Sequence, residues 1–222
     1  MNTSLSASVL NPSKGIITEY SAIYGYILFH RPAEFRIVGK APMFPETILD
    51  MVCHENRFQL YLSKKNLLLK GDGNASGNSN NAVENPRPDA FLKSLTIAPP
   101  DPGFTILEND TNQTGAVYIL LILDRAGNEL RLVRSVSFDR YSPTHYRAKT
   151  FDSSGSLDGD TKYSRWKTYQ GISYPSAIDI QRVRENYEVQ IRVLNMKMNP
   201  PNVTPDKFVL VQPPGATVRR LN

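Results

Sequence analysis

The sequence has few of the features that mark disulfide-stabilised, membrane-spanning or exported chains. Among its 222 residues there is one cysteine, Cys53, so no disulfide can form within the chain. The longest apolar run, Ala116–Leu123, ends at Asp124 and is far shorter than the roughly 18–20 residues of a membrane helix. The beginning of the sequence has no basic stretch followed by an apolar one, so the chain as given predicts no secretion signal.

Charge of one sign is not in large excess either. Lys and Arg number 26 against 21 Asp and Glu, a formal net charge of +5, and 40% of the residues are hydrophobic. This balance excludes a wholly disordered chain. The basic residues are spread along the sequence and form no stacked basic–aromatic strand pattern, so we expect no nucleic-acid partner. No shift in composition marks a boundary, and we predict one domain over residues 1–222.

Residue groups that would indicate chemistry are scarce. Cys53 and His54 are neighbours in a predicted strand, so their side chains point to opposite faces and cannot form a nucleophile–base pair. His30, His54 and His145 fall at predicted turns without metal-ligand spacing, and we expect them to be solvated. The sequence therefore predicts no catalytic residue, no metal and no cofactor, and indicates a protein that is not an enzyme.

Short apolar segments dominate what is present. Sixteen prolines and thirteen glycines separate segments rich in β-branched and aromatic residues, a pattern typical of all-β proteins. Short turns such as 125–128 join successive segments, which favours a mainly antiparallel sheet. The predicted strands are Ile17–Phe29, Glu34–Gly39, Thr47–Cys53, Arg57–Ser63, Asn66–Lys70, Gly115–Leu123, Glu129–Phe138, Tyr146–Phe151, Thr161–Tyr169, Ser176–Arg182, Tyr187–Lys197 and Phe208–Val211.

One segment departs from the strand pattern. Prolines followed by Asp89 predict a short helix over Arg87–Leu95. Its apolar residues would cover the sheet, so we expect Phe91 or Leu92 to be buried against sheet residues. The preceding residues 72–82 are rich in Asn, Gly and Ser, which predicts a flexible loop.

Some of the predicted strands are apolar on both faces, most clearly Gly115–Leu123. A sheet with one face in water should alternate apolar and polar residues. A strand without that alternation needs its second face covered by a helix, or lines an apolar hollow. Little of the remaining sequence looks helical, which favours a curved sheet or half-barrel around such a hollow. Packing of these residues against one another as ordinary core is the alternative.

Five sequence blocks, taken in order, resemble a known family. They are YGYILFHRPAEFRIVGKAP, ILDMVCHENRFQLYLSKKNLLLKGD, ENPRPDAFL, YSRWKTYQGISYPSAIDIQR and DKFVLVQPPGA. In their order and spacing over residues 4–214 they resemble the LolA/LolB superfamily of bacterial lipoprotein carriers and its outer-membrane lipoprotein relatives.

The resemblance implies a mainly β fold, a half-open antiparallel β-barrel with short lid helices that holds acyl chains in an apolar cavity. It implies a non-enzymatic envelope protein that acts in lipoprotein or lipid carriage or in outer-membrane assembly. The expected partners are lipid or lipoprotein acyl chains, an envelope protein and a membrane surface. The expected location is the periplasm or the outer membrane, as a lipoprotein.

Two features depart from the family pattern. Members usually begin with a signal peptide, which in lipoprotein members ends at a lipid-modified cysteine, followed by a helix and a first strand. The present sequence begins at about that first strand, Ser4–Leu10, so we expect the leader and first helix to be missing or the protein to be atypical. The polar insert at 73–81 also replaces what is normally a tighter connection into the helix.

The predicted acyl-chain cavity consists of bulky apolar residues that share one face of each strand by period-2 alternation, together with two helix residues. They are Phe35, Ile37, Leu49, Met51, Leu60, Leu62, Phe91, Leu92, Val117, Ile119, Leu121, Leu132 and Phe138. The alternative is an interaction module of the same fold, whose cavity is filled by its own side chains and which binds another protein.

Overall fold

The computed structural model describes residues 2–11, 16–30, 34–41, 46–54, 56–73, 88–96, 105–112, 115–142, 144–184 and 187–221. Within these ranges the strands are β1 (Asn2–Asn11), β2 (Ile16–His30), β3 (Glu34–Lys40), β4 (Thr47–His54), β5 (Arg57–Leu62), β6 (Leu67–Asp72), β7 (Thr105–Asn112), β8 (Gly115–Ala126), β9 (Glu129–Asp139), β10 (His145–Phe151), β11 (Leu157–Tyr169), β12 (Ile172–Arg182), β13 (Tyr187–Asn195) and β14 (Thr217–Arg220). The helices are the 3-10 turn η1 (Ser63–Lys65), the α-helix α1 (Pro88–Leu95) and the 3-10 turn η3 (Pro205–Phe208).

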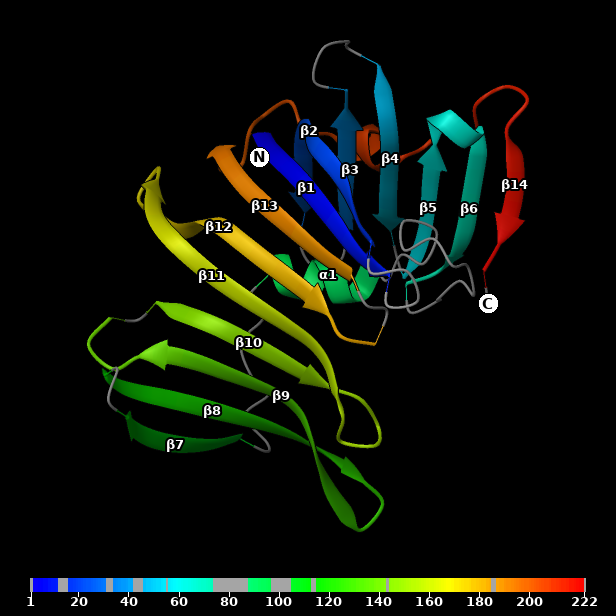
Figure 1. Cartoon of the computed structure of the whole chain (residues 1–222). Helices are drawn as coiled ribbons and strands as arrows, with labels where there is room; N and C mark the ends of the chain where they lie inside the picture. The colour runs from blue at the N-terminus through cyan, green and yellow to red at the C-terminus, as the bar shows by residue number, and fades with distance from the viewer. Residues whose placement is uncertain are drawn as a thin grey trace.

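All of these strands belong to one sheet, in the order β14-β6-β5-β4-β3-β2-β1-β13-β12-β11-β10-β9-β8-β7. Neighbours are antiparallel, apart from the parallel pair of β14 with β6. Among the described strands the two edges, β14 and β7, do not pair with each other, and the sheet curves without closing (Figure 1). The predicted mainly β fold with a half-open antiparallel barrel is confirmed.

The sheet has two halves, joined through β1 and β13 (Figure 1). We call β2–β6 the N-terminal half-sheet and β7–β12 the second half-sheet. The main core lies on the face that carries α1, which we call the inner face. Buried side chains of both halves meet there, including Ile27, Phe35, Phe58, Ile178 and Ile180.

The outer face of the N-terminal half-sheet is covered by residues 205–210, which comprise η3 and the two residues after it. We call these residues the C-terminal segment. Phe208 and Leu210 pack there against Val52 and Leu68 in a second buried cluster. The predicted strand Phe208–Val211 is wrong, because η3 ends at Phe208 and the last strand is β14. Alternation of Phe208 and Leu210 resembles a strand in sequence.

In the structure, the carbonyl groups of this segment are bonded to a side chain rather than to a neighbouring strand. The Arg36 guanidinium donates hydrogen bonds to the carbonyl oxygens of Lys207 (2.9 Å) and Val209 (3.5 Å). Arg36 is itself held by two hydrogen bonds to the Asp50 carboxylate, at 2.6 and 2.9 Å. This bidentate pair therefore fixes the C-terminal segment on the sheet.

Several predicted elements are confirmed and two strands were not predicted. The predicted helix exists as α1, starting at Pro88, and the first strand expected from the resemblance exists as β1. The unpredicted strands are β7, which is polar in its second half, and the short β14. Residues 74–82 of the predicted flexible loop lie outside the described residues. No helix of the described part is long and apolar enough to cross a membrane.

Candidate ligand-binding face

The N-terminal half-sheet brings six of the predicted cavity residues together. The strand register aligns Phe35 with Cys53, and Ile37 with Met51 and Leu60. Leu49 lies opposite Leu62 in the same way, so all of these side chains share the inner face. Phe35 is 0% exposed, and the others are buried or pack against the same cluster.

Helix α1 lies against this apolar face. Leu95 is buried in the main core, and the predicted residues Phe91 and Leu92 pack against it while staying partly exposed. The expected burial of Phe91 or Leu92 against sheet residues is met only in part, because both side chains pack against the core cluster but stay partly exposed. With eight residues, α1 spans about 12 Å, enough to reach from one half-sheet towards the other.

In the described part of the chain, the hydrogen bonds that join α1 to other elements lie at its two ends. At the first end, the Asp89 amide donates to the carbonyl of Gly73, 3.2 Å away, just after β6. A side chain at Gly73 would clash, since a Cβ atom there would lie 2.4 Å from Oδ1 of Asp89. At the other end, hydroxyl groups of the second half-sheet donate to helix carbonyls: Tyr163 to Ser94 and Tyr174 to Leu95, both at 2.9 Å.

These two tyrosines satisfy carbonyl groups that a helix end leaves without partners. Tyr163 is buried and Tyr174 is partly buried. Burial raises the pKa of Tyr163 to about 12 and raises the pKa of Tyr174 as well. Both groups are therefore protonated donors over the physiological range. Helix α1 thus bridges the two half-sheets through contacts at its two ends.

The second half-sheet places its apolar residues differently from the prediction. Leu120 and Ile122 of β8 pack against the main core. Val117, Ile119 and Leu121 alternate with them and so lie on the outer face, beside strand residues such as Ser135 and Ser137 of β9. The expectation that these three residues line the inner face is therefore off by one position, because a strand apolar on both faces gives no signal to choose between them.

The two predicted residues of β9 also differ from each other. Phe138 lies opposite Tyr118, with ring centroids 5.7 Å apart, in register with the inner-face residues of β8. Leu132 lies opposite Leu123, beyond an irregularity of the register after Ile122. Leu132 does not belong to the main core as described.

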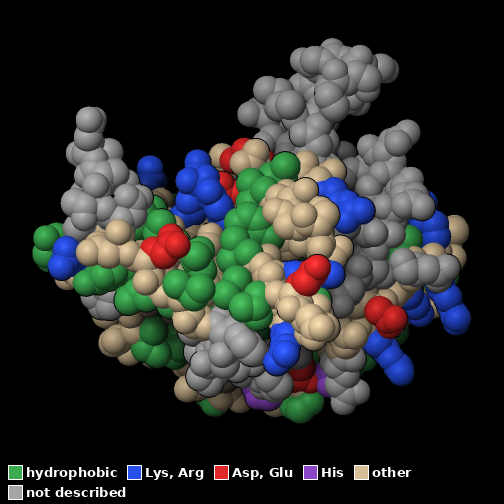
Figure 2. Space-filling view, turned by 90° about the horizontal axis from the view of Figure 1, so that it is seen from below, with side chains coloured by type: hydrophobic (Ala, Val, Ile, Leu, Met, Phe, Trp, Pro, Cys, Tyr) green, Lys and Arg blue, Asp and Glu red, His purple; other side chains and the backbone are tan. Residues whose placement is uncertain are grey.

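Other inner-face residues were not in the predicted set. They are chiefly Ile178, Ile180 and Ile191, which are fully or almost fully buried, with Trp166 and Tyr174 packed against the same core. Alternation of the isoleucines of β12 with Asp179 and Gln181 was the available signal. Figure 2 shows that hydrophobic side chains also gather in a band on one surface, with charged residues on both sides of it.

The two histidines whose side chains are described, His30 and His54, pair with one carboxylate. His30 and His54 are exposed at strand ends, as predicted, and both pair with the carboxylate of Glu34. The hydrogen bond from His30, at 2.7 Å, is the main reason that the pKa of Glu34 is lowered. The side chain of His145 lies outside the described residues. Within the described ranges, no three His, Cys, Asp or Glu side chains come together in a way that could hold a metal ion.

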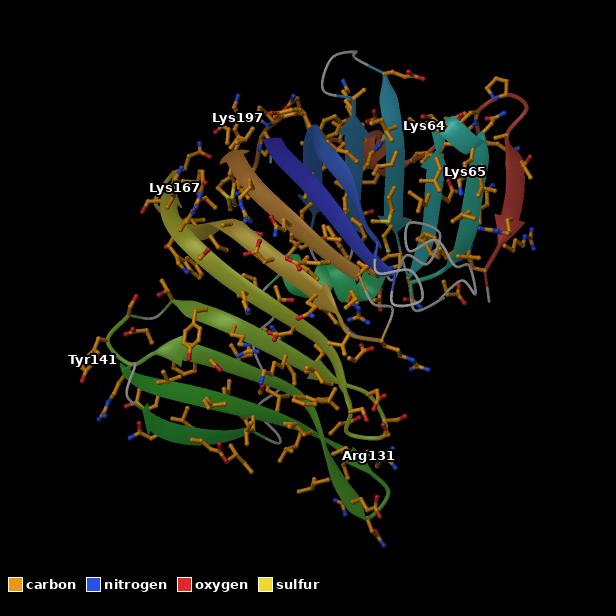
Figure 3. The ribbon with its side chains drawn as sticks, viewed as in Figure 1. Lys64, Lys65, Arg131, Tyr141, Lys167 and Lys197 are labelled. Atoms are coloured by element: carbon orange, nitrogen blue, oxygen red, sulfur yellow. The ribbon has the colours of Figure 1, made fainter. Side chains whose placement is uncertain are left out.

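One end of the sheet carries several lysines. Figure 3 shows Lys64 and Lys65 at the turn between β5 and β6, and Lys167 and Lys197 at the same end of the molecule. Arg131 lies at the far tip of the β8–β9 hairpin. Leu194, which is 60% exposed, lies near the end of β13, three residues before Lys197. An exposed apolar side chain therefore lies close in sequence to one of these lysines.

Comparisons with known proteins agree with this geometry at the level of the fold. No family model and no curated protein matches the sequence. Among solved structures, the chain is similar to a domain named for outer membrane lipoprotein sorting from Vibrio parahaemolyticus, with TM-score 0.59, 10% identity and coverage of 93% of this chain and 88% of that one.

Two further solved structures are similar. A LolA superfamily protein from Nitrosomonas europaea aligns with TM-score 0.57 and 12% identity, over 93% of this chain and 86% of that one. A DUF1329 family protein from Desulfovibrio piger aligns with TM-score 0.56 and 16% identity, over 94% of this chain and 88% of that one. Together with the half-open sheet and its helix, these matches show that the chain has the LolA-like fold.

Proposed function

We propose that this protein is a non-enzymatic protein of the bacterial envelope that binds lipid or lipoprotein acyl chains between α1 and the inner face of the sheet. Its role would be lipoprotein or lipid carriage, or outer-membrane assembly, in the periplasm or at the outer membrane as a lipoprotein. The observation that carries the proposal is an apolar inner face shared by both half-sheets beneath a helix fastened mainly at its ends.

The free energies involved support the entry of an acyl chain beneath α1. Burying one methylene contributes about 0.8 kcal/mol, so ten buried carbons contribute roughly 8 kcal/mol before ordering costs. Each neutral hydrogen bond that fastens α1 contributes only about 1 kcal/mol net. The hydrogen bonds of α1 alone would therefore not keep an acyl chain out, and Phe91 and Leu92, already partly exposed, would cover the bound chain.

A second candidate function is favoured by the density of the core. Phe35, Phe58 and Ile178 are already completely or almost completely buried. If the side chains themselves fill the inner space, the protein is an interaction module that binds another envelope protein. The two functions differ in whether the isolated protein takes up an acyl chain.

The lysine-bearing end is the part that we propose to face a membrane. Lys64, Lys167 and Lys197 would attract anionic lipid head groups, each contributing about 1 kcal/mol near the surface. Leu194, exposed and three residues before Lys197, would enter the lipid interface. This orientation would bring the ends of the curved strands close to the source of acyl chains.

The test is the uptake of a fluorescent fatty-acid methyl ester, which has an acyl chain and no charge. Leu120→Asp on the inner face should weaken its binding by about tenfold or more, because a carboxylate there must be desolvated. Leu121→Asp, on the outer face of the same strand, is the matched control and should leave binding unchanged. Circular dichroism would verify that both variants fold.

Absence of binding to the unsubstituted protein at micromolar probe would refute the acyl-chain proposal in favour of the interaction module. Native mass spectrometry of protein purified from bacterial membranes provides a second measurement. Lipid that remains bound in the gas phase would support carriage.

A further inference from the structure

A row of polar residues crosses the inner face of the second half-sheet. Arg134 of β9 lies opposite Thr150 of β10, and Thr150 lies opposite Gly159 of β11. Gly159 in turn lies opposite Arg182 of β12. These four strands are consecutive in the sheet (Figure 1), so the four residues form one line, which we call the polar row.

The neighbouring row of residues shows that the polar row faces inward. Side chains two positions apart on a strand share a face. Two positions from the polar row lie Val136, Ala148 and Ile180, all buried in the main core. The fourth residue of that row, Thr161, has its hydroxyl 3.1 Å from the hydroxyl of Ser94 in α1. The polar row therefore lies on the α1 side of the sheet, beside apolar core.

Gly159 makes room at the middle of the row. A Cβ atom at this position would lie 2.8 Å from Nη1 of Arg182 and 2.9 Å from Oγ1 of Thr150. Both side chains thus extend over the glycine from opposite sides. Arg182, which is 4% exposed, is fixed by its Nη2 donating to Oδ2 of Asp158 at 2.8 Å. One arginine of the row is therefore matched by a carboxylate within the protein.

Arg134, the other arginine of the polar row, has no carboxylate partner of this kind in the described part of the chain. Arg134 forms no hydrogen bond or ion pair among the described residues, and the titratable group that acts on it electrostatically is the phenol of Tyr163, which is neutral at physiological pH. Its burial lowers the pKa of the guanidinium, as expected for a cation that has lost water without gaining an anion. Next to it, the hydroxyl of Thr150 is buried and has no hydrogen-bond partner within the described structure.

The Thr150 hydroxyl is buried and Arg134 is partly buried, and unpaired donors removed from water are unfavourable unless something accepts their hydrogen bonds. A guanidinium offers five donors in a planar fork that fits a carboxylate or a phosphate. The apolar groups beside it, Ile122 on one side and Val136 on the other, suit a hydrocarbon chain rather than a free small anion. The row is therefore complementary to an amphiphile with one anionic group.

We propose that Arg134 and Thr150 bind the anionic head group, carboxylate or phosphate, of the acyl ligand whose chain lies on the inner face beneath α1. The inference rests on the proposed function, because it names the chemical class of the ligand of that same face. In this arrangement the Arg134 fork holds two oxygens of the head group, and the Thr150 hydroxyl donates to one of them. Arg182 adds positive potential across Gly159.

The experiment compares two probes that differ only in charge, a fluorescent long-chain fatty acid and its methyl ester. The unsubstituted protein should bind the acid at least about tenfold more tightly than the ester, the size expected for a charge-assisted bidentate contact. Arg134→Gln should abolish this preference while leaving the affinity for the ester unchanged. Thr150→Val should reduce the preference partly and keeps the β-branched shape, so it serves as the second variant if Arg134→Gln does not fold.

Arg131→Gln is the matched control, since Arg131 lies on the same strand at the exposed hairpin tip (Figure 3). It should leave both affinities unchanged. A second pair of probes, phosphatidic acid and diacylglycerol with identical chains, separates the two sources of negative charge. A preference for the acid form in the fatty-acid pair identifies a carboxylate ligand, and a preference confined to the phosphatidic-acid pair identifies a phosphate ligand.

Equal affinity for charged and uncharged members of both pairs would overturn this inference and leave the acyl-chain proposal intact. Failure of every probe to bind would refute the acyl-chain proposal itself, and this inference with it. Retention of the charge preference in a folded Arg134→Gln variant would place the head group elsewhere and also overturn the inference.

Discussion

The rest of the chain covers the two half-sheets differently. The N-terminal half-sheet is covered on both faces, by α1 on the inner face and by the C-terminal segment with Phe208 and Leu210 on the outer face. The second half-sheet leaves large apolar side chains exposed, with Leu107 at 57%, and carries the polar row. Under the proposed function, the first half would serve as scaffold, and the second half carries the unsatisfied groups, Arg134 and Thr150, that would bind a ligand.

The largest expected difference between the halves is in the response to truncation. Phe35→Ala removes a side chain that is 0% exposed and should lower the free energy of unfolding by about 3–5 kcal/mol. Ile122→Ala, in the partly exposed core of the second half-sheet, should lower it by only about 1–2 kcal/mol. Urea unfolding followed by circular dichroism measures both. Equal losses would show that the second half is as tightly packed as the first.

A smaller effect tests how the C-terminal segment is held. Arg36→Met should lower the free energy of unfolding by about 2 kcal/mol, because it leaves the buried part of Asp50 and two carbonyl groups of the segment without donors. Arg192→Met breaks the more exposed ion pair between Arg192 of β13 and Asp179 of β12. It should change the free energy of unfolding by less than about 1 kcal/mol.

Limited proteolysis tests whether Arg36 holds the C-terminal segment on the sheet. Cleavage near Lys207 should become faster in Arg36→Met and stay slow in Arg192→Met. Unchanged cleavage in Arg36→Met would mean that Phe208 and Leu210 hold the segment by packing alone.

The two half-sheets should lose stability at different alkaline pH values, because each contains a buried titratable group with a different pKa. Burial, and less strongly the charge of Asp89, raise the pKa of Cys53 in the N-terminal half-sheet to about 11 from an ordinary 9.0. The folded state binds this proton more tightly than the unfolded state, so the associated stability is complete below pH 9.0 and is lost as the pH rises towards 11.

We expect a loss of about 1 kcal/mol by pH 10 from Cys53, measured as the free energy of unfolding at pH 8 and 10. Tyr163 in the second half-sheet has its pKa raised to about 12, so its contribution falls only above pH 10. Cys53→Ala should abolish the loss between pH 8 and 10. A loss of unchanged size in that variant would assign it to another group.

The smallest expected effect concerns the lysine-bearing end. Lys64→Gln should weaken binding to vesicles containing anionic lipid by at most about 1 kcal/mol, and the effect should decrease with added salt. Arg131→Gln, at the opposite tip, should have no effect. Vesicle sedimentation measures both variants. Equal weakening by both would mean that net charge, rather than this end of the molecule, governs the attraction.

The sequence predicts the inner face of the N-terminal half-sheet better than that of the second half-sheet. In the N-terminal half-sheet Phe35 and Ile37 alternate with Arg36, so alternation chooses the inner face and the predicted residues come together. In β8 both faces are apolar, and no local signal distinguishes Leu120 from Leu121. Only pairing with β9, which is non-local, decides the face.

The other differences between the predicted and the observed structure also depend on contacts that are distant in sequence. The C-terminal segment resembles a strand in its alternation, but its carbonyl groups bond to Arg36, a residue distant in sequence. The position of Arg134, between the apolar neighbours Leu132 and Val136, was visible as an interruption of an alternating strand. Its significance depends on burial, which the sequence does not give.

The parallel strand at the C-terminal end has a consequence for the behaviour of the protein at high concentration. An uncovered β6 would expose a row of backbone donors and acceptors to which a strand of another molecule could add. Strand β14 occupies that position, is only four residues long, and ends in Arg219 and Arg220. A second molecule approaching this border would meet a short, exposed strand with the same positive charges as its own. The last residues of the chain therefore oppose self-association and fibril growth at this border.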